Sequence, residues 1–447
     1  MRSAASGLRL LCLLIGIASP ALRAQEPEST PRSREDQLRD LLGIEDPEER
    51  TDAIRSAARD SEVADWISVI RQFRPSPPQQ AGTSRHSIEL WNGEELEQTE
   101  LFVHVPRAIV DEPGRQVPLI LYGHGTGGSG ASGPRLWSQV AEAVPAIVVA
   151  PSESGPNVGY RYSQRETHVT LSALRWALRT LPVDAHQVVM TGVSRGGHQS
   201  WDLGARFPDR FAGIAPMIGG PRVNPAEGQN NFRYLENLNA LPIRDLQGLQ
   251  DDARLIRNLE IAFEILEGFG ADDAQFLTFA DRGHSFDFGA VDWAEWIVGL
   301  RRDPLPREVV RLAARPGEGR TAWLEIAKTS RKVEDDVRLR VQASEWEKLD
   351  ELGQTRYLID FVTERTARAS GRLVKRGVLE IETEQVDRIA VWLSSEMIGQ
   401  DGRVQVTING KDRRKKVVTS ARVLLEDFCQ RLDRRFLPVA RLEWKPR

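Results

Sequence analysis

The chain has 447 residues, of which 40% are hydrophobic and 28% are charged, and its formal net charge is −4. This length suits two or three domains with substantial cores, and the composition excludes a disordered chain. The small negative charge gives no electrostatic basis for binding nucleic acid or an anionic membrane surface. The one dense basic run, KDRRKK at 411–416, is expected to be a solvated hairpin arm rather than a binding patch.

Residues 1–24 have the layout of a secretory signal peptide. Two arginines precede an apolar run from Leu10 to Ala18, and Pro20 and small residues follow, so we expect cleavage after Ala24. The run is shorter than the ~20 residues of a transmembrane helix, which makes an uncleaved anchor the minority alternative. We therefore expect an exported protein, periplasmic or secreted, with no stable membrane insertion. Cys429 would then be the one remaining cysteine, which excludes an intramolecular disulfide and a cysteine-rich zinc site.

Residues 25–82 are predicted to form a helical segment and a linker. Val63, Trp66, Ile70 and other apolar residues recur at helical spacing, and PSPPQQAG at 75–82 breaks the pattern. We expect a small helical pair within 32–73 that packs on the next domain and carries no chemistry.

Residues 83–303 are predicted to form an α/β domain, a mostly parallel sheet with flanking helices, because short apolar runs alternate with helical stretches. Strands are expected at 101–105, 117–123, 146–150, 187–192 and 211–217, and helices at 164–181, 195–206, 251–268 and 290–300.

Residues 304–447 are predicted to form a separate, mostly β accessory domain, because apolar and polar residues alternate as in half-buried antiparallel strands. Asn409-Gly410 indicates a type I′ hairpin, and a helix is expected at 420–432. The strands are expected at 322–328, 337–343, 377–383, 388–393 and 403–408.

The stretch TGVSRGGH at 191–198 contains a candidate nucleophile, Ser194. The pattern Gly192-x-Ser194-x-Gly196 lies between a predicted strand and a predicted helix, and that context is typical of a serine held on a tight, exposed turn. A serine hydroxyl reacts only beside a base. We interpret Ser194 as the nucleophile rather than as part of an ordinary glycine-rich turn.

The loop after the strand at 117–123 is a candidate oxyanion hole. It reads His-Gly-Thr-Gly-Gly at 124–128, and its glycines let the backbone approach a substrate carbonyl. The expected donors are the N–H groups of Thr126, to within one residue, and Arg195. A phosphate-cradling loop is the alternative, but no Gly-Lys-Ser/Thr ending follows.

The base is predicted to be His284, in the loop that follows the strand within 276–288. His198, one helical turn after Ser194, is expected to pack behind the nucleophile, and His124 to shape the oxyanion loop. The other histidines lie outside loops at the carboxyl ends of strands. Metal-binding HxH and HExxH spacings are absent, which disfavours a metallohydrolase.

The acid is expected between the serine and the histidine, within 241–255, which offers Asp245, Asp251 and Asp252. Asp245 falls inside a predicted strand, and Asp252 suits a helix cap. Asp251, three residues after Gly248, is favoured, and Asp252 stays open as the alternative.

Three segments resemble the α/β-hydrolase superfamily, within it exported bacterial esterases related to polyhydroxybutyrate depolymerases and feruloyl esterases. They are LYGHGTGGSG at 121–130, VDAHQVVMTGVSRGGH at 183–198 and FPDRFAGIAPMIGG at 207–220. The sequence departs from that group at the penultimate strand, which ends Gln247-Gly248 instead of His-Gly. The Ser-Arg-Gly-Gly form also resembles prolyl-oligopeptidase-like peptidases.

The resemblance implies a serine carboxylesterase that needs no metal or organic cofactor and acts on a small-molecule or polymer-linked ester. Two alternatives remain: a serine peptidase on the same fold, and a catalytically silent scaffold whose accessory domain binds a glycan or a partner.

Overall fold

The structure, a computed structural model, describes residues 32–59, 61–152, 159–224, 229–335 and 343–446. The predicted signal peptide therefore lies outside the described residues, as does the strand expected at 337–343 except for its last residue. In the described part of the chain, no helix is both long and apolar enough to cross a bilayer.

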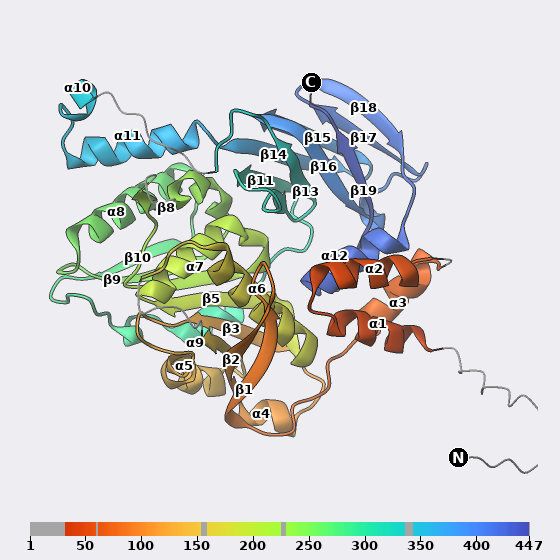
Figure 1. Cartoon of the computed structure of the whole chain (residues 1–447), viewed down its shortest axis with the longest axis horizontal. Coiled ribbons are helices and arrows are strands. Elements are labelled where there is room, and N and C mark those ends of the chain that lie inside the picture. Colours follow the sequence, from red (N-terminus) through yellow and green to blue (C-terminus); the bar gives the residue numbers. More distant parts are fainter. Residues whose placement is uncertain (1–31, 60, 153–158, 225–228, 336–342, 447) are drawn as a thin grey trace, which may run out of the picture.

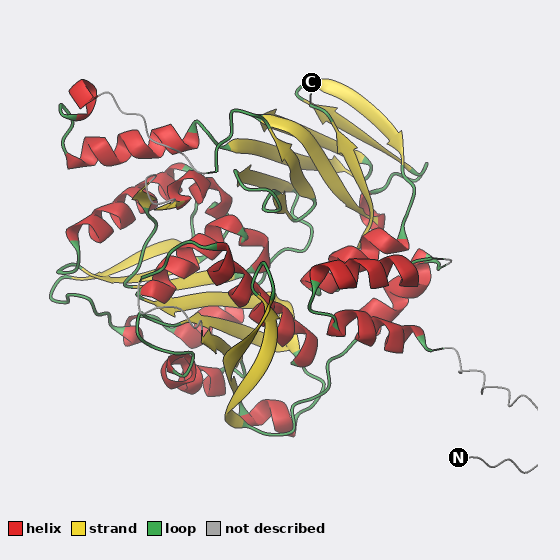
Figure 2. Cartoon of the chain, viewed as in Figure 1, coloured by secondary structure: helices red, strands yellow, loops and turns green. Residues whose placement is uncertain are grey.

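An eight-stranded sheet organises the middle of the chain (Figures 1 and 2). Its order is β1-β2-β4-β3-β5-β6-β9-β10. β2 pairs antiparallel with β1 and β4, and every pair from β4 to β10 is parallel. The α/β class is thereby confirmed. The strands are β1 Gly82–Trp91, β2 Leu96–Val105, β3 Val117–Gly123, β4 Ile147–Ser152, β5 Val183–Val193, β6 Gly213–Met217, β9 Ile243–Gly248 and β10 Ala274–Phe279.

Helices cover both faces of this sheet because the central strands are apolar on both faces. Along β5, Val188 and Met190 join one buried cluster and Val189 joins the other, as the two-residue period of a strand requires. The first cluster lies under α6 (Gln164–Thr180), α7 (Arg195–Arg206) and α8 (Ala253–Gly268), and the second under α5 (Ser132–Ala143) and α9 (Trp293–Gly299).

Each strand and helix predicted between 101 and 300 is present, with α7 and β3 at the predicted bounds and β5 four residues longer at its start. The predictions missed β1 and α5. β1 is polar and mostly exposed, so it has no apolar run, and α5 begins with Ser132-Gly133-Pro134, which resembles a turn. Shorter elements complete this region: α4 Arg107–Asp111, β7 Val223–Asn224, β8 Gln229–Asn230 and the 3₁₀ helix η3 Asn231–Leu238.

The N-terminal segment holds three helices, so the predicted helical pair is wrong. They are α1 (Arg34–Gly43), α2 (Pro47–Ala57) and α3 (Val63–Gln72). Asp46 caps α2, and Pro47 occupies its first turn. This combination marks the start of a separate helix, which the prediction of two helices within 32–73 did not take into account. α2 and α3 pack against α12 (Ala421–Arg431) from the far end of the chain (Figure 1).

The C-terminal part contains two sheets that share one apolar core, including Trp323, Leu379, Ile389 and Val404. The hairpin predicted at Asn409-Gly410 is present, with φ of 47° and 75°. α11 (Glu351–Thr363), preceded by α10 (Ala343–Trp346), was not predicted, and neither were the strands at 308–313, 320–321, 367–375 and 438–444. The five-stranded sheet contains β11 Glu308–Ala313, β14 Ala367–Lys375, β15 Val378–Glu384, β17 Arg403–Ile408 and β18 Lys411–Lys416. The four-stranded sheet contains β12 Arg320–Thr321, β13 Leu324–Thr329, β16 Val386–Ser394 and β19 Pro438–Trp444.

The basic run forms β18, an edge strand that is exposed at every residue except the half-buried Arg413. Cys429 is buried and free, and burial raises the pKa of its thiol to about 12. The domain boundaries expected near 24, 82 and 303 stay predictions.

Candidate active site

Ser194 occupies the turn between β5 and α7. Its backbone has φ of 57° and ψ of −109°, a region that non-glycine residues rarely adopt and that costs conformational energy. Two hydrogen bonds hold the turn: the Ser194 N–H donates to the Met217 carbonyl at 2.8 Å, and the His198 N–H donates to the Ser194 carbonyl at 3.0 Å. The strand, turn and helix place the serine side chain at the carboxyl edge of the sheet, as in a nucleophile elbow.

The flanking glycines are required by the packing around this turn. A Cβ atom at Gly196 would lie 1.9 Å from the Gly123 carbonyl oxygen, and one at Gly192 would lie 2.5 Å from the Gly196 carbonyl group. Neither contact is sterically allowed, so α7 can approach β3 and β5 this closely only with hydrogen at both positions. The Gly-x-Ser-x-Gly spacing is therefore a packing requirement of the observed turn.

The structure brings Ser194, His284 and Asp251 together from three loops. The Ser194 Oγ lies 2.9 Å from the His284 Nε2, and the His284 Nδ1 lies 2.7 Å from an oxygen, Oδ2, of Asp251. The Asp251 side chain is 9% exposed and the His284 side chain 52% exposed. The imidazole thus has a buried carboxylate on one side and an accessible hydroxyl on the other.

The three candidate acids occupy different places. Asp252 caps α8, accepting from the N–H groups of Arg254 and Leu255 at 2.9 and 3.0 Å. Asp245 is fully buried inside β9, where the Trp201 indole N–H donates to it at 2.7 Å, and burial raises its pKa well above the usual value. Asp251 is the carboxylate that contacts His284.

Asp251 is held in its ionised form by its donors. Burial alone would raise its pKa, but hydrogen bonds from the Gln247 side chain, the Asp252 N–H and His284 outweigh burial and lower the pKa below its usual value. The Asp251 charge is therefore available to the His284 imidazole at neutral pH.

The loop after β3 lies against the serine turn. A Cβ atom at Gly125 would lie 3.4 Å from the Val193 carbonyl oxygen and 3.9 Å from the Ser194 Cβ. The Gly128 N–H closes a turn onto the Gly125 carbonyl at 3.0 Å, with Gly127 at φ of 74°. Thr126 lies within this exposed turn, and Arg195 is the first residue of α7, where backbone N–H groups have no acceptor within the helix.

His198 packs beside the nucleophile, where it was expected. Its Nδ1 lies 2.6 Å from the Gly220 carbonyl oxygen, and its Nε2 lies 3.2 Å from the Arg222 guanidinium. The Gly220 N–H also points at Nδ1, at 3.0 Å, and the guanidinium, which can only donate, faces Nε2. Burial and the neighbouring Arg222 charge lower the His198 pKa to about 4, so its ring is a weaker base than an ordinary imidazole. Its two nitrogens contact Gly220 and Arg222, whereas the His284 Nε2 contacts the Ser194 Oγ.

The other histidines lie where the sequence predicted. His124 contacts the Gly125 carbonyl at 2.9 Å in the loop after β3. The rest lie within regular elements, His86 in β1, His104 in β2, His168 in α6 and His186 in β5. In the part of the chain that is described, no group of three or more histidine, cysteine, aspartate or glutamate residues is placed to hold a metal ion.

At Gly248 the loop that carries Asp251 lies directly against the loop that carries His284. This close contact was not predicted from the sequence. A Cβ atom there would lie 2.1 Å from the Gly283 carbonyl oxygen and 2.5 Å from that of Arg282. The Gln250 N–H donates to the Arg282 carbonyl at 2.8 Å, so the two loops are in backbone contact. Any side chain at this position must separate them.

We therefore expect Gly248→Ala to lower kcat for an ester substrate by about 10²-fold, the cost of a displacement near 1 Å in a catalytic group. Gly268→Ala is the matched control because, apart from its chain neighbours and the backbone of its own helix, no atom of the described residues lies within 4 Å of its Cβ position. Its rate should equal that of the wild type. Steady-state kinetics on the two variants checks this, and equal rates would show that the loops tolerate separation.

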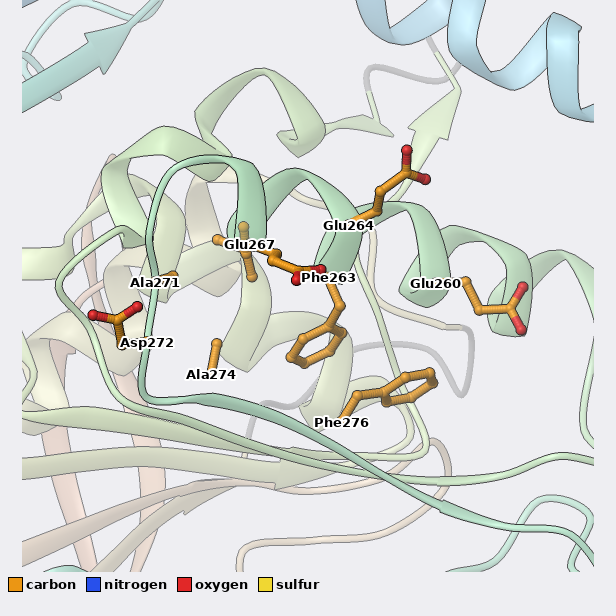
Figure 3. A pocket seen from close by; sticks show the side chains of 9 residues that line it. Glu260, Phe263, Glu264, Glu267, Ala271, Asp272, Ala274 and Phe276 are labelled. Carbon is orange, nitrogen blue, oxygen red and sulfur yellow. The ribbon is translucent and has the colours of Figure 1, made fainter.

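A cavity of about 580 Å³ lies apart from these residues, between α8 and the edge strand β10 (Figure 3). The rings of Phe263 and Phe276 stack at 5.0 Å between their centroids, and acidic side chains such as Glu260 and Glu267 stand around them. None of its lining residues is Ser194, Asp251 or His284.

A mostly parallel sheet with helices on both faces, a serine on the strand-to-helix turn and the chain order Ser, Asp, His define the α/β-hydrolase fold. The chain has this fold, which confirms the fold predicted from the resemblance. No family model matches the chain, and no curated protein matches it.

Solved structures similar to the chain include a thermostable esterase (20% identity, TM-score 0.40), covering 49% of this chain and 63% of that one. Another is the S-formylglutathione hydrolase FrmB from Staphylococcus aureus, with 14% identity and a TM-score of 0.36, covering 49% of this chain and 95% of that one. A third is the Pyrococcus horikoshii acylaminoacyl peptidase, with 15% identity and a TM-score of 0.37, covering 46% of this chain and 38% of that one.

Proposed function

We propose that the protein is a serine hydrolase that cleaves carboxylic esters through an acyl-enzyme intermediate. The observation that carries the proposal is the alignment of the Ser194 Oγ, the His284 imidazole and the Asp251 carboxylate at 2.9 and 2.7 Å. This alignment supplies a nucleophile, a base within hydrogen-bond reach and a group that orients the base.

In the proposed first step, the His284 Nε2 takes the proton of the Ser194 hydroxyl while the Oγ attacks the ester carbonyl carbon. The N–H groups of Thr126 and Arg195 donate to the resulting oxyanion. His284 then gives its proton to the departing alcohol as the ester C–O bond breaks, which leaves an ester of Ser194.

In the second step, His284 takes a proton from water as the water oxygen attacks the acyl carbon. The bond from this carbon to the Ser194 Oγ then breaks, the carboxylic acid leaves, and His284 returns the proton to the Oγ. Asp251 keeps the Nδ1 hydrogen on its own side of the ring and stabilises the imidazolium of both steps. The mechanism requires neither a metal ion nor an organic cofactor. The substrate is a small-molecule or polymer-linked ester.

A serine peptidase would use the same three residues, and a silent scaffold would carry them without turnover. Short aryl esters, peptide anilides and a fluorophosphonate probe separate the three functions. We expect ester turnover, much slower anilide turnover and labelling of Ser194. Faster anilide turnover would favour the peptidase, and an unlabelled Ser194 would favour the scaffold.

We further propose that the protein is exported, with residues 1–24 removed. Sequencing the N-terminus of the protein recovered outside the cytoplasm tests this, and a start at Gln25 is expected. Recovery with Met1 intact would contradict it.

A further inference from the structure

The side chain of Gln247 reaches the triad acid from inside the sheet. Gln247 is the next-to-last residue of β9 and is fully buried. Its Nε2 donates to the Asp251 Oδ2 at 2.9 Å and to the Gly248 carbonyl at 2.9 Å. Both amide hydrogens are therefore used within the acid loop.

The orientation of this amide is fixed by its neighbours. A flipped amide would turn the Oε1 of Gln247 toward the Gly248 carbonyl oxygen and the Asp251 carboxylate, two acceptors that cannot donate to it. In the observed orientation the Oε1 is buried and has no hydrogen-bond partner among the described residues. A buried acceptor without a donor destabilises a fold, so this amide satisfies Asp251 while leaving its own oxygen unsatisfied.

The contacts of Asp251 show what this amide adds. The Asp251 Oδ1 accepts from the Asp252 N–H at 2.8 Å, and the Oδ2 accepts from Gln247 and from His284 at 2.7 Å. The Asp252 N–H belongs to the adjacent residue and contacts the Oδ1, the oxygen that does not face His284. Gln247 donates from a strand to the Asp251 Oδ2, which is the same oxygen that contacts the His284 Nδ1.

We propose that Gln247 is a positioning residue, which holds the Asp251 carboxylate in the orientation that receives the Nδ1 hydrogen of His284. The proposal rests on the proposed hydrolase function and deepens it. Gln247 touches no reacting atom, and its effect reaches Ser194 through Asp251 and His284.

The first test is Gln247→Met, which keeps the length of the side chain and removes the donor. We expect kcat for an aryl ester to fall by about 10- to 100-fold, as the loss of a hydrogen bond to a charged group implies. KM should be unchanged, and Tm should stay within about 3 °C because the unsatisfied Oε1 is removed as well. Gln72→Met is the matched control, since its side chain is exposed at the end of α3 and donates to the Ser68 Oγ at 3.3 Å; its kinetics should equal those of the wild type.

The second test is Gln247→Glu, read as a pH profile of kcat relative to the wild type. When protonated, the introduced carboxyl can donate to Asp251 as the amide does, and when ionised it repels Asp251. Activity relative to the wild type should therefore be highest at acidic pH and fall as pH rises. The titratable groups near Gln247 and Asp251 include His284, the adjacent Asp252, Asp245 in the same strand and His198 in α7, and all of them are present in both proteins.

Three results would overturn the positioning role. These are wild-type kcat in Gln247→Met, a loss of kcat in that variant that only parallels a large fall in Tm, and a pH profile of Gln247→Glu that matches the wild type. Failure of the proposed hydrolase function can be told apart from failure of this positioning role. In the first case the wild-type protein itself would neither hydrolyse the ester nor react with the fluorophosphonate.

Discussion

Replacing Ser194 with alanine should lower kcat for an aryl ester by about 10⁴- to 10⁶-fold, the size of effect found when a triad nucleophile is removed. The reason is geometric, because the Ser194 hydroxyl is the group that the His284 Nε2 contacts at 2.9 Å. Without the Oγ no acyl-enzyme can form. Labelling by a fluorophosphonate should disappear in the same variant, which gives a readout independent of the substrate chosen.

Ser200→Ala is the matched control for this prediction. Ser200 lies in α7, the helix that follows Ser194, is buried and donates to the Gly196 carbonyl of that helix at 2.8 Å. Its loss should leave kcat within about threefold and labelling intact, since a neutral hydrogen bond within a helix contributes only about 1 kcal/mol. A folded Ser194→Ala protein that retained activity within tenfold of the wild type would contradict the assignment.

His284→Ala should produce a loss of similar size, and the two changes should not add. A serine without its base and a base without its serine disable the same step, so the double variant should be no slower than either single one. Steady-state kinetics on the three proteins measures this. Multiplicative losses would mean that the two residues act in separate steps.

The serine turn could be predicted from the sequence because every part of it is local. The apolar residues of β5 precede Ser194, α7 follows it at the predicted bounds, and the two glycines are needed for packing within that short stretch. The histidine could be predicted for a similar reason, since a loop after the last strand must end at the same edge of the sheet as Ser194.

The acid could only be narrowed to two residues. Asp251 and Asp252 are adjacent, and which of them faces His284 depends on how the loop after β9 lies against the loop after β10. That arrangement depends on the contact of Gly248 with the Gly283 carbonyl and on the parallel pairing of the two strands, neither of which is a property of the local sequence. The amide of Gln247 could not be predicted either, because a buried glutamine in a strand has no pattern of its own.

Two of the missed elements, β1 and α11, share a physical cause. β1 pairs with β2 along ten residues but is mostly exposed, so its sequence lacks the alternation that marks a half-buried strand. α11 has few buried residues, Ile359 and Val362 among them, so its helical period is weak.

Asp251→Asn should lower kcat by about 10⁴-fold, nearly as much as removal of the serine, although only one atom of the side chain changes. An asparagine amide can donate to the His284 Nδ1, which would then accept instead of donating and leave the hydrogen on Nε2. In that tautomer the Nε2 cannot take the Ser194 proton. The imidazolium formed during the reaction would also lose its counter-charge.

The two neighbouring carboxylates give matched controls for this change. Asp252→Asn should stay within about threefold of the wild type, because asparagine caps a helix as well as aspartate does. Asp245→Asn should do the same, since its fully buried carboxyl contacts the Trp201 indole rather than His284. Each of the three variants makes the same aspartate-to-asparagine change, and the three positions lie within eight residues of one another. Any difference between their kcat values therefore reports where the carboxylate lies relative to His284. A large loss in Asp252→Asn with little loss in Asp251→Asn would reassign the acid and, with it, the positioning role of Gln247.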